Sequence, residues 1–284
     1  MTGSTERSPL DATSRRSFWK YFSASTISNM GDGVTAIAIP LVALQVLNAS
    51  NFEIGLLTAA SYAAVVLIGL PAGVIVQSFE LRRLQVSLDV FRAAALATVP
   101  LAVWWDILTI VHLFSVAFLV GLANNISAVA NATYLPQVVP RNQLIERNGL
   151  ISGSHAATQT LGPAGAGLLT QVVGAAGAIV VDTVSYLVSA LLFWRIPATP
   201  KLPVPAGAPG YFRQVVDGMR YLVRHPVLRP CASAATAANF ANGAILATLA
   251  PFVVRQLGFG PAALGVVSSP GFDGELVSWF SGVR

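Results

Sequence analysis

The sequence predicts an all-α protein built from transmembrane helices. Hydrophobic residues make up 54% of the 284 residues and charged residues only 10%, with a mean hydropathy of +0.66. Soluble domains carry about 25% charged residues. The apolar residues also occur in long runs, and a run of about 20 residues is enough for a helix to cross the ~30 Å hydrocarbon core of a bilayer. These observations predict a polytopic helical bundle.

The apolar runs predict the order of the helices. We expect spans over residues 18–47, 52–76, 85–105, 107–139, 149–173, 175–196 and 227–254, and a weak one over 261–284. Residues 1–17 are polar and predict a disordered cytoplasmic tail. Residues 197–226 predict a cytoplasmic linker, Pro-rich at first and then an amphipathic helix with a basic face. The sequence thus predicts a complete six-helix bundle over 18–196 and, over 227–284, the first two helices of a truncated second bundle.

Lys and Arg are concentrated in alternate connections. The connections at 48–51, 104–107 and 172–176 hold none, and Arg255 alone departs from the pattern. The expected basic side holds Lys20, Arg82, Arg83, Arg141, Arg147 and the stretch from Arg195 to Arg229. Basic connections stay in the cytoplasm, so we expect an inner-membrane protein with a cytoplasmic N terminus. The positive residues separate apolar runs and form no basic stripe for nucleic acid.

Asp32 lies near the middle of the first predicted span. A charged side chain at that depth costs roughly 2.5–3.5 kcal/mol on insertion scales unless it faces a polar cavity or a partner. Asp32 could be a neutral, protonated residue held between helices, or part of a proton or substrate site. We favour the second interpretation, because acids inside membrane spans are usually functional.

The two ends of the chain share a short pattern. Residues 29–33 read NMGDG and residues 239–243 read NFANG, and Gly55 recurs as Gly265 at the same offset. Asn242 thus takes the place of Asp32 in the second copy. Internal repeats of this kind predict a transporter whose site lies between two related halves, near the midplane.

Three segments carry a resemblance to a known family: residues 28–32 (SNMGD), residues 135–141 (LPQVVPR) followed by Asn148, and residues 182–189 (DTVSYLVS). Over about residues 18–267 the chain resembles the major facilitator superfamily, in the exporter branch that includes the enterobactin exporter and macrolide-efflux proteins. The resemblance implies two bundles that rock about a central site and export small, often amphipathic molecules, driven by a proton gradient. Asp32 would be the proton carrier, with Asn29 beside it in the pathway.

The connection between the second and third spans resembles the superfamily pattern G-x-x-x-D-R-x-G-R-R. Gly73, Arg82 and Arg83 match it, whereas Gln77 and Ser78 replace its acid and base. The resemblance implies a gating role for the arginines. They could equally be simple topology anchors.

The fifth span resembles the glycine ladder of antiporters, which ends in G-P-x-x-G-G. The matching residues are Gly149, Gly162, Pro163 and Gly167. Small residues let helices approach closely, and proline bends a helix by removing a backbone donor. The ladder implies ion-coupled export, but a generic packing face would look the same.

Five further polar residues inside the predicted spans are candidates for a functional or structural role. Asp89 and Arg92 lie one turn apart and are expected to form an ion pair, which we favour as structural. Asp182 is a second candidate for protonation. Asn124 and Asn131 share one helix face, as either a cavity lining or interhelical hydrogen bonds would require.

The sequence holds no pattern typical of an enzyme or a cofactor site. His112 and His155 are isolated from other ligand types, and we find no phosphate loop, zinc spacing or Ser-His-Asp arrangement. We therefore expect a transporter of a small molecule, embedded in lipid and coupled to protons. The alternative is a chain that transports nothing alone and needs a second chain to supply four missing helices.

Overall fold

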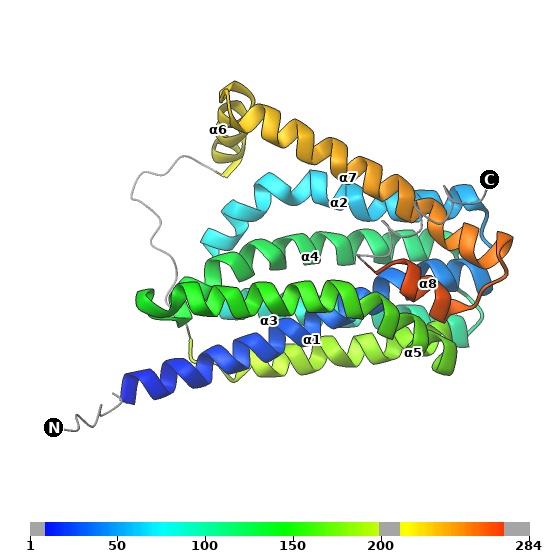
Figure 1. The fold of residues 1–284 in the computed structure, drawn as a ribbon, viewed down its shortest axis with the longest axis horizontal. Coiled ribbons are helices and arrows are strands. Elements are labelled where there is room, and N and C mark those ends of the chain that lie inside the picture. Colours follow the sequence, from blue (N-terminus) through cyan, green and yellow to red (C-terminus); the bar gives the residue numbers. More distant parts are fainter. Residues whose placement is uncertain (1–8, 199–210, 270–284) are drawn as a thin grey trace, which may run out of the picture.

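The computed structural model describes residues 9–198 and 211–269, and every regular element within those ranges is helical (Figure 1). Six of the helices are long and apolar enough to cross a membrane. The helices are α1 (Pro9–Gln45), α2 (Asn51–Ser78), α3 (Leu81–Trp104), α4 (Ile110–Val138), α5 (Leu144–Trp194), α6 (Tyr211–Arg224), α7 (Leu228–Pro251) and α8 (Pro261–Val267), with a 3-10 turn η1 (Arg141–Gln143) and a π-helical turn η2 (Phe252–Gln256). The predicted all-α transmembrane architecture is confirmed.

The helix α5 contains two of the predicted spans. Its backbone leaves the helical region at Gly174, where φ is +77°. Glycine has no Cβ and adopts this left-handed conformation without strain. Residues 144–173 form a first arm and residues 175–194 a second arm, which runs back antiparallel to the first (Figure 1). The connection between these two predicted spans is thus confined to Gly174.

The helix α1 begins at Pro9, so the prediction of a disordered tail up to residue 17 is wrong for residues 9–17. Ser17 and Phe18 are both buried, which anchors the helix at this point. Once a helix has a packed nucleus, each added residue gains a backbone hydrogen bond, so a polar segment can extend it. Residues 1–8 lie outside the described residues.

Two apolar clusters make the core. One gathers residues 37–44 of α1 with parts of α2 to α5, and the other gathers residues 18–24 with the ends of α3 to α5. In the second cluster the rings of Tyr21 and Tyr134 stack with centroids 5.2 Å apart, and Phe193 meets both rings edge-on. Between the clusters, α1, α3, α4 and the second arm of α5 carry polar side chains.

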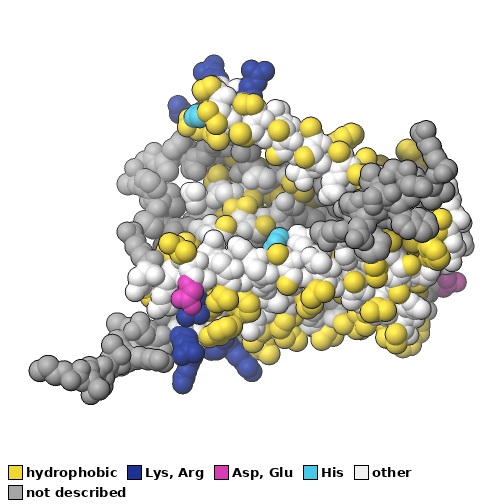
Figure 2. Space-filling model, viewed as in Figure 1, with side chains coloured by type: hydrophobic (Ala, Val, Ile, Leu, Met, Phe, Trp, Pro, Cys, Tyr) yellow, Lys and Arg dark blue, Asp and Glu magenta, His cyan; other side chains and the backbone are white. Residues whose placement is uncertain are grey.

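One end of the bundle is basic, and Figure 2 shows Lys and Arg gathered there. The Lys20 ammonium donates to the carbonyl oxygen of Arg195 (2.8 Å), and Arg82 donates to that of Ile196 (3.1 Å). The Arg147 guanidinium lies 4.6 Å from the centre of the Phe18 ring. We call this end the basic end and the other the opposite end.

The C-terminal segments meet the bundle from outside. The helix α7 lies alongside α2, and α6 precedes it at the basic end as the predicted amphipathic helix (Figure 1). At the opposite end Arg255 of η2 donates to the Asn51 side chain (2.6 Å) and to the Ala49 carbonyl oxygen. The helix α8 packs on the first arm of α5. The weak span predicted over 261–284 is helical to Val267, and residues 270–284 lie outside the described residues.

Candidate functional site

Arg92 of α3 is the centre of a polar cluster between the two apolar clusters. Its side chain is only 2% exposed and forms an ion pair with Asp89, as the sequence predicted. It also donates to Asn124 Oδ1 of α4 (2.8 Å), and its guanidinium carbon lies 4.4 Å from the centre of the Tyr186 ring. Arg92 therefore connects α3 with α4 and with the second arm of α5.

Asp32 lies at the edge of this cluster. Its Oδ1 is 3.8 Å from Arg92 Nη1 and accepts a hydrogen bond from the Tyr186 hydroxyl. The Asp32 side chain is 33% exposed, whereas Asp89 and Asp182 are fully buried. Among these three acids, Asp32 is the one through which the cluster reaches the surface of the bundle.

Asp182 is held on the second arm of α5 against α1. Its carboxylate accepts a hydrogen bond from Thr35, and Ser185 donates to its Oδ1 at 3.0 Å. The structure thus brings Asp32 and Asp182 to one cluster, bridged by α1. Arg92 pairs with Asp32 and Asp89, whereas Asp182 bonds to the hydroxyls of Thr35 and Ser185.

Two glycines allow α1 to approach α5 this closely. A Cβ added at Gly31 would collide with the side chains of Asp182 and Ser185 on the second arm. A Cβ at Gly33 would lie 3.2 Å from the backbone of Gly162 on the first arm. Side chains at these positions would separate the helices, so the G-D-G pattern positions Asp32 between the two arms.

A row of amides extends the cluster along α3 and α4. Ser127 donates to Gln85 Oε1 (2.6 Å), and Gln85 Nε2 donates to Asn131 Oδ1 (2.6 Å). Asn124 and Asn131 therefore both face α3, as their shared helix face predicted. Gln85 was not among the predicted site residues, although its spacing to Asp89 and Arg92 places all three on one helix face. Thr35 and Tyr186 were not predicted either, because no spacing in the sequence indicates their roles.

Asn29 lies apart from the cluster. It lines a small hollow between α1 and the first arm of α5, together with Ser25 and Ser154. Nearby, the hydroxyls of Thr26 and Ser154 are 2.7 Å apart. Asn29 is therefore on the side of α1 that faces the first arm, not the side that faces Arg92.

The predicted glycine ladder makes close contacts at some positions only. A Cβ on Gly167 would lie 2.9 Å from the Cα of Gly265, and one on Gly265 would collide with the Pro163 carbonyl oxygen. A Cβ on Gly149 or on Gly73 would meet nothing within 4 Å. Among the described residues, the expected close helix approach thus occurs at Gly162 and Gly167, and it does not occur at Gly149.

Arg82 and Arg83 belong to the first turn of α3 rather than to the predicted connection. Both bind Glu80: Arg82 Nε lies 3.2 Å from Oε1 and Arg83 Nε lies 2.8 Å from Oε2. Glu80 thus supplies an acid beside the two arginines in a loop whose motif acid is replaced by Gln77. The three residues lie at the basic end, apart from the Arg92 cluster. Within the described ranges, no group of three or more His, Cys, Asp or Glu could hold a metal ion.

Comparisons with known proteins agree with this architecture. A sequence profile of the family described as "Transmembrane secretion effector" matches residues 4–271. The chain is 22% identical over 263 residues to YfiS of Bacillus subtilis (strain 168), an uncharacterized MFS-type transporter, covering 90% of this chain and 58% of YfiS. It is 26% identical over 237 residues to the uncharacterized MFS-type transporter y4rN of Sinorhizobium fredii (strain NBRC 101917 / NGR234), covering 81% of this chain and 56% of y4rN.

The fold is also similar to that of a solved transporter. The crystal structure of a bacterial homologue of the human lysosomal transporter Spinster, inward-facing and unoccupied, superposes with a TM-score of 0.64. The two sequences are 14% identical, and the match covers 92% of this chain and 59% of the other. The chain spans between half and two thirds of the length of each of these proteins.

Proposed function

Because the chain belongs to the transmembrane secretion effector family of MFS-type transporters, we propose that it serves proton-coupled export of a small molecule, with Asp32 as the proton carrier. The proposed branch of the superfamily is the exporter branch, whose substrates include siderophores and macrolides. The transported molecule would be small and amphipathic. The observation that carries the proposal is the partial exposure of Asp32 beside the buried Arg92.

A proton carrier needs access to water. It also needs a charged partner whose attraction to the carrier changes when the carrier gains or loses a proton. Asp32 combines these properties, since its carboxylate reaches the bundle surface and lies 3.8 Å from Arg92 Nη1. When Asp32 gains a proton, Arg92 keeps Asp89 as its counter-ion and loses one of two attractions. Arg92 also contacts Tyr186 and Asn124, so protonation at one edge alters the forces that connect three helices.

The contacts of the C-terminal segments support a transport state closed at one end. Arg255 bonds to the α1–α2 connection, and α8 packs on α5 through Gly265, both at the opposite end. With the N terminus in the cytoplasm, the basic end faces inward. These contacts support an arrangement closed on the outer side, from which Asp32 would exchange protons with the cytoplasm. Gly73, Arg82 and Arg83 would act at the inner gate.

Replacing Asp32 by asparagine tests the proposal. The amide keeps the shape of the side chain, and the second copy of the pattern carries Asn242 at this place, so the protein should fold. In cells lacking their own exporters, efflux of ethidium, a macrolide and a catecholate siderophore is measured with and without a proton gradient. We expect gradient-dependent efflux of at least one probe by the wild type, and none by D32N.

Asp106→Asn is the matched control. Asp106 lies in the α3–α4 connection, exposed, with a positive φ that asparagine also tolerates. It should leave efflux unchanged. Wild-type efflux by D32N would remove Asp32 from the mechanism. No gradient-dependent efflux by the wild-type chain, of any probe, would favour the alternative that the chain requires a partner chain.

A further inference from the structure

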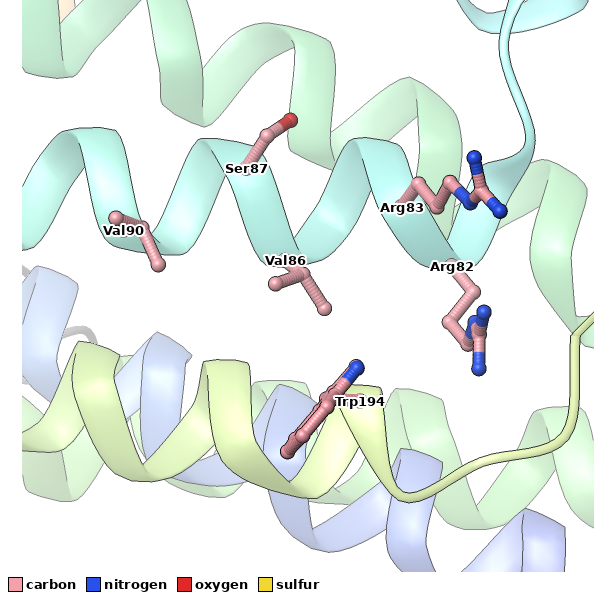
Figure 3. Close-up of a pocket in the computed structure, with 6 residues that line it drawn as sticks. All are labelled: Arg82, Arg83, Val86, Ser87, Val90 and Trp194. Carbon is pink, nitrogen blue, oxygen red and sulfur yellow. The ribbon is translucent and has the colours of Figure 1, made fainter.

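A groove opens at the basic end, away from the Arg92 cluster. It has a volume of about 490 Å³ and lies between α3 and the end of the second arm of α5 (Figure 3). Arg82 and Val86 extend from α3 toward the side of the groove that carries Trp194. The lining residues are Arg82, Arg83, Val86, Ser87, Val90 and Trp194.

The walls of this groove carry exposed apolar side chains. Trp194 is 67% exposed although it is one of the largest apolar side chains, and tryptophan is enriched where a protein crosses the membrane–water interface. Leu191 and Leu187 are exposed one and two turns before it, respectively, on the same face of the second arm. On α3, Val86 and Val90 are likewise one turn apart. The apolar wall therefore continues from the interface toward the membrane interior.

The mouth of the groove carries positive charge. Glu80 binds the Nε atoms of both Arg82 and Arg83, so the three side chains together keep one net positive charge. Arg82 Nη1 donates a hydrogen bond to the Ile196 carbonyl oxygen. The Arg83 side chain is 79% exposed, and its terminal nitrogens bond to no other described residue. Guanidinium nitrogens in this state bind phosphate oxygens in pairs.

We propose that this groove is a binding site for an anionic phospholipid. The phosphate binds at Arg83 and Arg82, the indole of Trp194 packs against the glycerol region, and one acyl chain follows Val86 and Val90 into the membrane. The net positive charge favours phosphatidylglycerol or cardiolipin over zwitterionic lipids. This inference goes beyond the proposed transport, and it requires only that the chain spans a membrane.

Tryptophan quenching in reconstituted vesicles tests the site. The 284-residue chain with Trp194 as its sole tryptophan (W19F, W104F, W105F, W279F) is placed in phosphatidylcholine vesicles that contain an equal share of either dibrominated phosphatidylglycerol or dibrominated phosphatidylcholine. An arginine at the membrane surface enriches anionic lipid roughly fivefold. We expect brominated phosphatidylglycerol to quench Trp194 more strongly than brominated phosphatidylcholine does. The difference should correspond to a local enrichment of phosphatidylglycerol beside Trp194 by about that factor.

A chain with Trp19 as sole tryptophan is the control at matched depth, because Lys20 beside it bonds to Arg195 at the same end. Trp19 has basic neighbours but does not line this groove, so it reports general surface attraction and should show a smaller preference. The double variant R82Q/R83Q should reduce the Trp194 preference to the Trp19 level. R83Q alone, which loses only the Glu80 contact, should also lower it, and R82K/R83K should retain most of it.

A steric variant separates the groove from the charge. Val86→Phe fills the space between α3 and Trp194 and keeps both arginines, and the preference should fall to the Trp19 level. The proposal is overturned if Trp194 is quenched equally by the two lipids, or if its preference equals that of Trp19. It is also overturned if the preference survives the loss of both arginines or the filling of the groove.

Discussion

Replacing Arg92 by glutamine should be among the most destabilising single changes in the first bundle. Arg92 is 2% exposed, and its ion-pair partner Asp89 is fully buried. Removing one member of a buried pair costs about 3–5 kcal/mol, because the remaining charge is left without a partner. Two neighbours add to the loss, since Asn124 loses its donor and Asp32 loses its nearest cation.

Asp89→Asn should cost less stability when Arg92 has already been replaced by glutamine than it costs alone. Alone, D89N leaves Arg92 with Asp32 as a counter-ion at 3.8 Å, so we expect a smaller loss, about 1–3 kcal/mol. In the double variant neither charge is present, and an amide faces an amide. The double variant should therefore be more stable than the sum of the single losses implies, by about 2 kcal/mol, within the range measured for residues that share a network.

Unfolding in mixed micelles, by titration with sodium dodecyl sulfate and followed by tryptophan fluorescence, measures these differences. Arg213→Gln is the matched control, because this side chain is 79% exposed and lies 4.0 Å from Asp217. Such an exposed pair contributes roughly 0–1 kcal/mol, so R213Q should unfold almost as the wild type does. A double variant whose loss equals or exceeds the sum of the two single losses would refute the reasoning.

Two further predictions concern packing and orientation. Gly265→Ala should lower the free energy of unfolding by about 1–3 kcal/mol through overpacking against α5. Gly149→Ala, with nothing within 4 Å of the added methyl group, should raise the free energy of unfolding by up to about 1 kcal/mol. Equal effects of the two variants in the same unfolding assay would contradict the α5–α8 contact. Reporter fusions after residues 80 and 145 should be cytoplasmic, and fusions near 50, 106 and 174 external, because the Lys/Arg residues gather at the basic end. A reversed pattern at two or more sites would overturn the orientation.

The sequence alone determined the elements of this protein. Apolar runs longer than a membrane is thick can only be helices, because each backbone group must find its hydrogen-bond partner within the segment. Helix spacing also predicted the Asp89–Arg92 pair, since residues three apart share one face. Where only local propensity was available, the prediction was less accurate: α1 reaches back to Pro9 because its packed residues extend the helix into polar sequence.

The tertiary structure decided which polar residues act together. Asp32 and Tyr186 are separated by 154 positions and meet because α1 crosses the second arm of α5 at Gly31. Asn29 is three residues from Asp32 and still faces a different arm. Sequence spacing specifies neighbours on one helix, whereas contacts between helices depend on crossing points and side-chain volumes. For that reason the sequence predicted Asp32 as a candidate, and only the packed bundle connected it to Arg92.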